Sequence, residues 1–555
     1  MVLNRRSMNQ SIKRMTVRSL GVFLIALAVA IAIGIWQLNL VGDFRVDDAY
    51  ISLSFSKNLA HGNGLVFSVA ERVEGYSNFL WVVILSIPYA FGAEDAYPFA
   101  RVLGVSTIFL LAWVTYRFAR RHAGSFVALA APLIVLSSSD LFRAEQSALE
   151  TVPYTMALTT GFFLYLREHL EPLTRRRRYS LWAFLAAALI RIDGMVPLSF
   201  ILAFEVLFSL FARRFSVYAF LRWAAIPLGI YLIYFLWRWH YYGLLLPSTY
   251  YAKSLANSDP QRGIGYAFGV VRDWGLVYWA PFVSLSFWRW RRLGGPLVLG
   301  FLCGIIAYVI HVGGDWMPFQ RFWLPYLPLA AVFVTWGFAN AWALTASLPK
   351  YARAHVLAGI LGALAFSVTH LCAASIDSPE EDGKVRFAAQ VLQHTKVELK
   401  DDARFLRAII RRPGERLATD YPGLFSVDTD AQIIDMWGLC NAMIARRGDS
   451  AGISPIYGKS CPLCYASFDT DYFHTFVPLI RTRNTFVSLN DVIQNVFHGP
   501  AIDSVIGLHT NFVAGRVTET STSRTLWFLE RRRPGRDFSL RLEPNGMRVD
   551  YPFGH

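Results

Sequence analysis

The stretch that decides the fold is residues 20–40, LGVFLIALAVAIAIGIWQLNL, which contains no charged residue. About 20 apolar residues are needed to cross the hydrocarbon core of a bilayer. The run has this length and lacks a small-x-small cleavage site, which favours a retained transmembrane helix over a cleaved signal peptide. The residues before it include five basic ones and no acidic one, namely Arg5, Arg6, Lys13, Arg14 and Arg18. This asymmetry predicts a cytoplasmic N-terminus.

The composition extends the membrane assignment to most of the chain. Of the 555 residues, 54% are hydrophobic and 17% are charged, against about 45–50% and about 25% in soluble proteins. This balance excludes a disordered chain, a collagen-like chain and a small disulfide scaffold. The net charge of +15 lies mainly beside apolar runs, as at Arg175–Arg178 and Arg289–Arg292, and therefore indicates cytoplasmic loops rather than nucleic-acid binding.

Apolar run length and basic flanks together predict about eleven transmembrane helices. The run 78–92 contains Pro88 and is interpreted as a re-entrant or interfacial helix, because a crossing there would place the basic cluster after residue 116 outside. The predicted spans are 20–40, 98–116, 124–137, 151–166, 180–190, 195–211, 217–237, 274–288, 294–311, 322–343 and 354–374.

The sequence predicts two domains. Residues 1–376 form a membrane domain with an outer-face loop at 41–97, and residues 377–555 form a soluble α/β domain on the outer, periplasmic face. Long apolar runs stop after residue 376, and short alternating segments predict strands instead. Examples are Arg416–Asp420, Gln432–Met436 and Thr525–Leu529. A bacterial plasma membrane protein with several crossings is the predicted class.

The cysteines leave three interpretations open. Cys461 and Cys464 form a Cys-x-x-Cys pair near Cys440, which suits a redox motif, half of a zinc site or a structural disulfide. No second pair and no Cys-His cluster accompanies them, so a disulfide is favoured.

The unusual polar motifs all fall on the outer side in this topology. Charged residues at membrane depth are costly and indicate functional sites, and their common side predicts one site. The motifs are Asp47-Asp48-Ala-Tyr50, Glu71-Arg72-Val-Glu74-Gly75-Tyr76, Glu145–Glu150, Arg191-Ile-Asp193-Gly194, Tyr241–Lys253, and His311-Val-Gly-Gly-Asp315-Trp316 with Arg321.

Each motif has a structural and a functional interpretation. Asp47 and Asp48 suit a general base with a helper, a divalent-cation site, or acids at a helix N-terminus. The segment after them, Ala49–Leu59, is predicted to be an amphipathic interfacial helix. Arg191 and Asp193 suit either a structural ion pair or the lining of a polar cavity.

The segment Tyr241–Lys253 combines aromatic rings, hydroxyls and a cation. It suits an aromatic belt with a snorkelling lysine, or a site for a lipid-linked phosphate and its sugar. Lys253 and Arg321 would then neutralise the charge on a phosphate leaving group.

These motifs resemble those of GT-C membrane glycosyltransferases. The chain is most similar to the branch that includes the terminal β-(1→2)-arabinofuranosyltransferases of mycobacterial cell walls. The matching segments span almost the whole chain in order: Val46–Trp81, Ala148-Leu-Glu150-Thr, Leu189–Gly194, Tyr242–Lys253, Gly313–Pro325 and Ile434–Leu439.

The resemblance implies an inverting transfer of a sugar, with arabinofuranose as the first candidate, from a polyprenyl-phosphate donor to a cell-envelope glycan or glycoconjugate. It implies that Asp47 is the general base and that Asp48 positions substrate or a divalent cation; the metal requirement is left open. Donor and phosphate contacts are expected from Lys253, Arg321, Tyr250 and Arg191. Substrate positioning is expected from Glu74, Tyr76, Glu150, Asp193, His240 and Asp315.

Two other function classes fit a chain with many spans. A transporter or flippase would place polar residues near the bilayer midplane and often shows two related halves. An assembly factor that grips glycan would leave Asp47 and Asp48 dispensable. The one-sided polar motifs and the outer domain favour the enzyme.

Overall fold

The computed structural model describes residues 17–373 with short gaps and residues 407–551 in short segments. The described residues are 17–41, 46–68, 71–169, 179–211, 213, 216–257, 260–290, 295–315, 319–373, 407–410, 412, 414–419, 422–429, 431–435, 439–441, 472–474, 512–519, 525–534, 541–542 and 547–551. Cys461, Cys464, Trp316 and residues 436–438 lie outside them, so the predicted disulfide stays a prediction.

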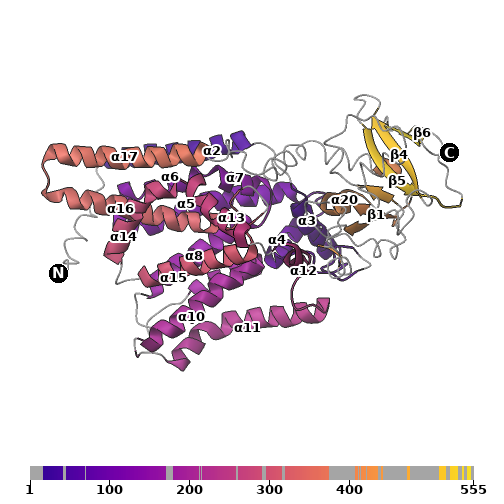
Figure 1. Ribbon diagram of the computed structural model, residues 1–555, viewed down its shortest axis with the longest axis horizontal. Coiled ribbons are helices and arrows are strands. Elements are labelled where there is room, and N and C mark those ends of the chain that lie inside the picture. Colours follow the sequence, from indigo (N-terminus) through magenta and orange to yellow (C-terminus); the bar gives the residue numbers. More distant parts are fainter. Residues whose placement is uncertain are drawn as a thin grey trace.

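The N-terminal two thirds of the chain form a helical bundle (Figure 1). Its helices are α2 (Val17–Val41), α5 (Tyr97–Val127), α6 (Ala130–Leu136), α7 (Ser139–Gln146), α8 (Thr151–His169), α9 (Ser180–Ile190), α10 (Met195–Phe211), α11 (Val217–Tyr242), α12 (Ser248–Asn257), α13 (Pro260–Asp273), α14 (Leu276–Trp290), α15 (Gly295–Val312), α16 (Leu327–Leu344) and α17 (Lys350–Ala373). Single 3₁₀ turns, η2 (Ile192–Gly194), η3 (Leu324–Tyr326) and η4 (Thr345–Ser347), join some of them.

The observed helices confirm a multi-pass helical fold. Five helical segments in the described residues are long and apolar enough to cross a membrane: Tyr97–Val127, Ile192–Phe211, Val217–Tyr242, Leu324–Ser347 and Lys350–Cys372. Shorter apolar helices lie among them, and the count of eleven spans stays a prediction. The predicted span at 124–137 differs most, because Gly124 with φ +73° bends α5 and the chain continues as the short helix α6.

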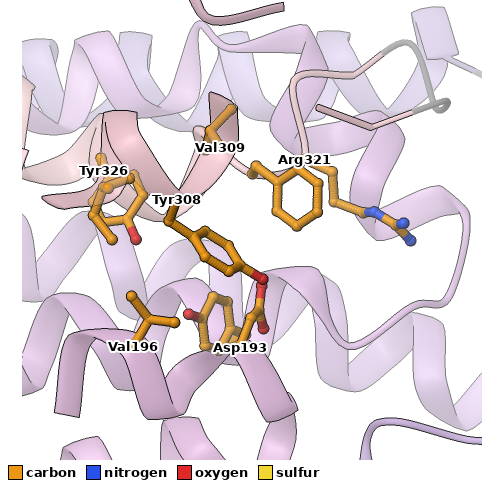
Figure 2. Close-up of a pocket in the computed structure, with 9 residues that line it drawn as sticks. Asp193, Val196, Tyr308, Val309, Arg321 and Tyr326 are labelled. Carbon is orange, nitrogen blue, oxygen red and sulfur yellow. The ribbon is translucent and has the colours of Figure 1, made fainter. Parts of the chain in front are cut away.

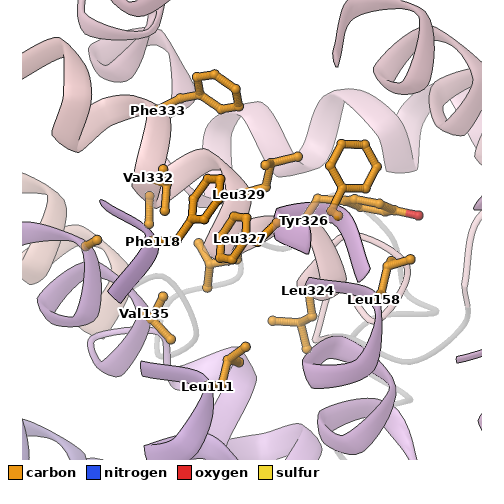
Figure 3. Close-up of a cluster of buried hydrophobic side chains, with 14 of the residues drawn as sticks. Leu111, Phe118, Val135, Leu158, Leu324, Tyr326, Leu327, Leu329, Val332 and Phe333 are labelled. Atoms are coloured by element: carbon orange, nitrogen blue, oxygen red, sulfur yellow. The ribbon is translucent and has the colours of Figure 1, made fainter. Parts of the chain in front are cut away.

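The bundle packs around one apolar core (Figure 3). Phe118 on α5 stacks on Phe163 of α8 with ring centroids 4.0 Å apart. Leu111, Val135 and Leu327 are each under 1% exposed. Outward-facing apolar side chains such as Leu232 and Ile233 remain exposed on α11, as expected for a surface that faces lipid.

The loop predicted to lie on the outer face, here called the outer loop, folds into two helices, α3 (Asp47–Ala60) and α4 (Phe79–Ala90). At about 1.5 Å per residue α4 is too short to cross the bilayer, in agreement with the interpretation of 78–92. The prediction of an interfacial helix at Ala49–Leu59 is wrong, because Ala49 to Ser56 are all buried. Helices α4 and α20 (Pro422–Asp428) pack against α3 and cover it.

The C-terminal part of the chain, from residue 407 onward, contains a mixed sheet with strand order β2-β1-β3-β5-β4-β7-β6 among the described residues; it is called the outer domain after its predicted side of the membrane. The strands are β1 (Arg416–Thr419), β2 (Gln432–Asp435), β3 (Tyr472–His474), β4 (Phe512–Glu519), β5 (Thr525–Arg531), β6 (Arg541–Leu542) and β7 (Met547–Asp550). β1, β2 and β3 are parallel, and the others pair antiparallel. Helix α20 connects β1 to β2, and α3 and α4 lie between the bundle and this sheet (Figure 1).

Candidate active site

Arg191 is the centre of a buried polar cluster at the end of α9. Its Nε and Nη2 donate to the two carboxylate oxygens of Asp193 at 2.9 and 3.0 Å. Its Nη1 donates to Oε1 of Glu150 at 3.2 Å. The guanidinium also lies 5.3 Å from the ring centroid of Tyr154 and 5.7 Å from that of Phe322. Arg191 and Asp193 therefore form the expected ion pair, and Asp193 also lines the pocket described below.

A chain of hydrogen bonds joins this cluster to the outer loop. Asn78 Nδ2 donates to Oε2 of Glu150 at 2.8 Å and to Oγ of Ser52 on α3 at 2.9 Å. Ile192 N–H donates to the carbonyl of Ser77 at 3.1 Å. These bonds bring together segments that lie up to about 140 residues apart, from Ser52 to Ile192. Asn78 is not among the site residues expected from the sequence.

A second ion pair lies next to the first. Arg321 donates through Nε to Asp315 Oδ2 at 2.6 Å and through Nη2 to Oδ1 at 3.2 Å. Gly313 and Gly314, with φ +83° and +75°, form the turn before Asp315. A Cβ on Gly314 would lie 2.6 Å from side-chain atoms of Tyr266, so glycine is required for this close approach.

A small pocket lies between the two ion pairs, and the space in it reaches about 290 Å³ only when the part open to solvent is counted. Figure 2 shows Tyr308 pointing toward Asp193 on one wall and Arg321 on the other side. Its lining combines aromatic rings, aliphatic chains and one charge of each sign: Tyr154, Asp193, Val196, Ile305, Tyr308, Val309, Arg321, Phe322 and Tyr326. An apolar, aromatic lining with few polar groups is typical of a small-molecule site.

Glu74 has a partner that the sequence reasoning missed. Its carboxylate is 1% exposed and accepts from Arg238 Nε at 2.8 and 2.7 Å. Arg238 Nη1 also donates to the carbonyl of Leu245 at 2.8 Å. The signal was present, since Arg238 is a charged residue at the end of an apolar run. Arg238 directly follows the predicted span 217–237, and the sequence does not show which residue it pairs with.

Tyr76 continues this buried patch. Its hydroxyl lies 3.1 Å from that of Tyr242, which also donates to the carbonyl of Leu65 at 2.7 Å. The Tyr76 ring meets Phe55 edge-on, with centroids 4.8 Å apart. Glu74 and Tyr76 thus hold the outer loop against α11.

Asp47 is held by the outer domain. Its Oδ1 accepts from the N–H of Leu424 at 2.8 Å and its Oδ2 from the N–H of Gly423 at 3.0 Å. Burial raises the pKa of the Asp47 carboxyl to about 8, with smaller contributions from the charges of Asp48 and Asp435, while the two amide hydrogen bonds oppose the rise. A carboxyl with a pKa near the working pH suits a general base.

The surroundings of the paired acids offer no complete cation site among the described residues. Each oxygen of Asp47 already accepts from one amide N–H. Within the described ranges no group of three or more His, Cys, Asp or Glu residues is arranged to hold a metal ion. Asp435 ends β2 and accepts from the N–H of Cys440 at 2.6 Å, the structural role expected at a strand end.

Several predicted site residues lie apart from the pocket or cannot be placed in it. His240 is exposed and lies two residues beyond Arg238, which puts it on the opposite side of α11. Tyr250 is 53% exposed on α12. Lys253 lies in the same helix, but its side chain is outside the described atoms. Asp48 is half-buried beside Asp47.

The chain is similar in sequence to two curated glycosyltransferases. No family model matches the chain. It is 26% identical over 322 residues to a terminal β-(1→2)-arabinofuranosyltransferase of Corynebacterium glutamicum, over 50% of this chain and 46% of that protein. It is 27% identical over 279 residues to the protein of the same name from Mycobacterium tuberculosis, over 48% and 43%. The chain thus spans about half the length of the curated relatives it matches.

Among solved structures, the fold is similar to that of ArnT from Cupriavidus metallidurans bound to undecaprenyl phosphate. The TM-score is 0.50 with 13% identity, over 81% of this chain and 92% of ArnT. The resemblance of the chain to the terminal β-(1→2)-arabinofuranosyltransferases is therefore confirmed in sequence, and its fold is similar to that of ArnT.

Proposed function

We propose that this protein is an inverting glycosyltransferase of a bacterial plasma membrane. It transfers a sugar, with arabinofuranose as the first candidate, from a polyprenyl-phosphate donor to a cell-envelope glycan or glycoconjugate on the outer face. The observation that carries the proposal is the network of ion pairs and hydrogen bonds that starts at Asp193 in the pocket wall and reaches α3, the helix that begins with Asp47. Similarity to arabinofuranosyltransferases supports the reaction class, and the undecaprenyl phosphate bound to ArnT supports the carrier.

The pocket suits the sugar better than the phosphate. Around it the carboxylates Glu150, Asp193 and Asp315 outnumber the guanidinium groups of Arg191 and Arg321, so a phosphate is excluded from the carboxylate side and fits only at the wall that Arg321 forms. Carboxylates instead accept hydrogen bonds from sugar hydroxyls. The aromatic rings in the lining offer apolar faces to a pyranose or furanose ring.

The proposed mechanism is a single displacement. The acceptor hydroxyl oxygen attacks the anomeric carbon, the bond from that carbon to the phosphate oxygen breaks, and Asp47 takes the hydroxyl proton. Polyprenyl phosphate leaves with the bonding electrons. We assign Lys253 and Arg321 to the phosphate, with Tyr250 at its edge, and Arg191 to holding Glu150 and Asp193 in the pocket wall. No step is assigned to a metal ion.

The deciding experiment measures release of polyprenyl phosphate by the purified full-length protein. A short-chain polyprenyl-phosphoryl-arabinofuranose donor is supplied with a panel of oligosaccharide acceptors, and acceptor-dependent release is the expected result. Release only from a different lipid-linked sugar would retain the enzyme class and discard arabinose. No release from any donor, with movement of the lipid-linked sugar across proteoliposomes, would establish the transporter alternative instead.

The pH dependence of kcat/KM for the acceptor should follow the Asp47 carboxyl. A base works only when deprotonated, so the rate should fall about tenfold for each pH unit below the pKa of about 8 and level off above it. The measurement is initial release rates from pH 5.5 to 9.5, with unfolding temperatures over the same range as the control. A profile that is flat down to pH 6 would contradict Asp47 as the base.

The proposed orientation predicts opposite labelling at two positions. In a background without native cysteines, Asn63→Cys, at an exposed turn after α3, should react with an impermeant maleimide in intact spheroplasts. Arg177→Cys should react only after the membrane is permeabilised. The reverse pattern would place the pocket and the outer domain on the cytoplasmic side.

A further inference from the structure

The carboxylate of Asp47 accepts hydrogen bonds from α20, a helix far away in the sequence. Its two oxygens accept from the N–H groups of Gly423 and Leu424 in the first turn of α20, at 3.0 and 2.8 Å. The first N–H groups of a helix have no acceptor within the helix. The carboxylate of Asp47 supplies this acceptor for two N–H groups of α20. One oxygen for each amide fixes the plane of the carboxylate as well as its position.

Gly423 is fitted to α3 by its lack of a side chain. A Cβ at this position would lie 2.3 Å from the carbonyl oxygen of Asp47, 2.8 Å from the N of Ile51 and 3.1 Å from the Asp47 carboxyl carbon. The first two atoms belong to the backbone of a buried helix and cannot move aside. Any larger residue must therefore push α20 away from Asp47.

The same edge of the outer domain makes further contacts with the outer loop. α20 begins where β1 ends, and Asp435 ends the parallel strand β2. The carboxyl ends of parallel strands are where open α/β sheets place their functional groups. Just beyond β2, Cys440 packs on Gly75. A Cβ added at Gly75 would lie only 2.4 Å from the Sγ of Cys440. Asn441 Nδ2 lies 3.4 Å from Glu71 Oε2.

Holding Asp47 in this way leaves it chemically competent. A carboxylate has about four lone-pair positions, and the two amides occupy one on each oxygen. The remaining positions are available to an acceptor hydroxyl. Because the bond to a reacting proton needs a heavy-atom distance of about 2.6–3.2 Å, a rotation of the carboxylate plane would remove that contact.

Resting on the function proposed above, we propose that the outer domain is a working part of the catalytic site, with the Gly423 and Leu424 amides of α20 orienting Asp47 for proton transfer. Gly423 is a positioning residue, since it acts only through Asp47. The membrane domain alone would then bind the donor but transfer sugar slowly.

The test compares two variants that both disturb the contact between α3 and α20. Gly423→Ala displaces the two amides, and kcat should fall about 10²-fold, the cost of a misplacement of about 1 Å, while the donor KM stays within about twofold. Lys57→Met removes the hydrogen bond from Lys57 Nζ to the carbonyl of Val427 at 3.1 Å, at the other end of α20. Its kcat should stay within about twofold of wild type.

A second measurement needs no activity and guards against misfolding of the Gly423 variant. In Asp47→Ala, measured above a pH of about 8, where the wild-type carboxyl is ionised, hydrogen exchange of the peptide that covers residues 422–428 should speed up about tenfold or more for two amides, as expected for the loss of bonds to a charged acceptor. Lys57→Met should leave these amides as slow as in wild type. Unchanged exchange in Asp47→Ala would overturn the proposal.

The outcomes separate the positioning role from the function itself. If wild type transfers sugar and Gly423→Ala keeps its kcat, or loses kcat only together with the donor KM, α20 does not position Asp47 and the proposal fails. If wild type releases no polyprenyl phosphate from any lipid-linked sugar, the proposed function fails, while hydrogen exchange still reports whether α20 holds Asp47.

Discussion

Replacing Asp47 with asparagine is expected to lower acceptor-dependent release of polyprenyl phosphate by about 10²- to 10⁴-fold, the usual contribution of a positioned general base. The amide of asparagine cannot take the acceptor proton. Its carbonyl oxygen still accepts one of the two N–H groups of α20, so the docking of the outer domain is largely retained. The measurement is the single-turnover rate with donor and acceptor at saturation.

Asp48→Asn provides the matched comparison, because Asp48 is the next residue on α3 and is also half-buried. It should lose less activity than Asp47→Asn, since Asp48 is assigned to positioning rather than to proton transfer. Both variants should elute and unfold like wild type in detergent. Wild-type rates in Asp47→Asn would remove the base and with it the proposed mechanism.

The sequence predicted the membrane part of the fold well because apolar run length and helix length obey the same physical limit. The run 195–211 coincides with α10, and the predicted span 151–166 lies within α8, which ends at His169. The bend at Gly124 was not predicted, since a single glycine inside an apolar run is tolerated in straight and bent helices alike.

The pairings within the site could be predicted only in part. The sequence predicts that Glu150, Arg191 and Asp193 lie close together, because all three are charged residues near membrane depth on the same predicted side. A buried charge requires a partner. Nothing in the sequence joins Asp47 to Gly423, which lies 376 positions further on. A glycine after a strand predicts a turn or a close approach, but the backbone that it approaches is decided by how two domains dock.

The largest expected loss of stability comes from breaking the Glu74–Arg238 pair. Both side chains are at most 3% exposed, and removal of one partner leaves the other charge buried without compensation. We expect Glu74→Gln to lower the free energy of unfolding by about 3–5 kcal/mol, seen as a lower unfolding temperature in detergent. Arg272→Met removes an exposed pair with Asp273, in which the arginine side chain is 58% exposed, and should cost less than about 1 kcal/mol.

The double variant Glu74→Gln/Arg238→Met distinguishes a structural pair from a substrate contact. A buried ion pair pays for desolvation of both charges, so replacing both partners should recover much of the stability that either single change loses. If Glu74 only stabilises the outer loop, the rate of sugar transfer should recover together with stability, because Tyr76 and the turn that carries Asn78 return to their wild-type positions. Recovered stability without recovered transfer would show that the Glu74 carboxylate also contacts the substrate, the role that its position in the outer loop first suggested.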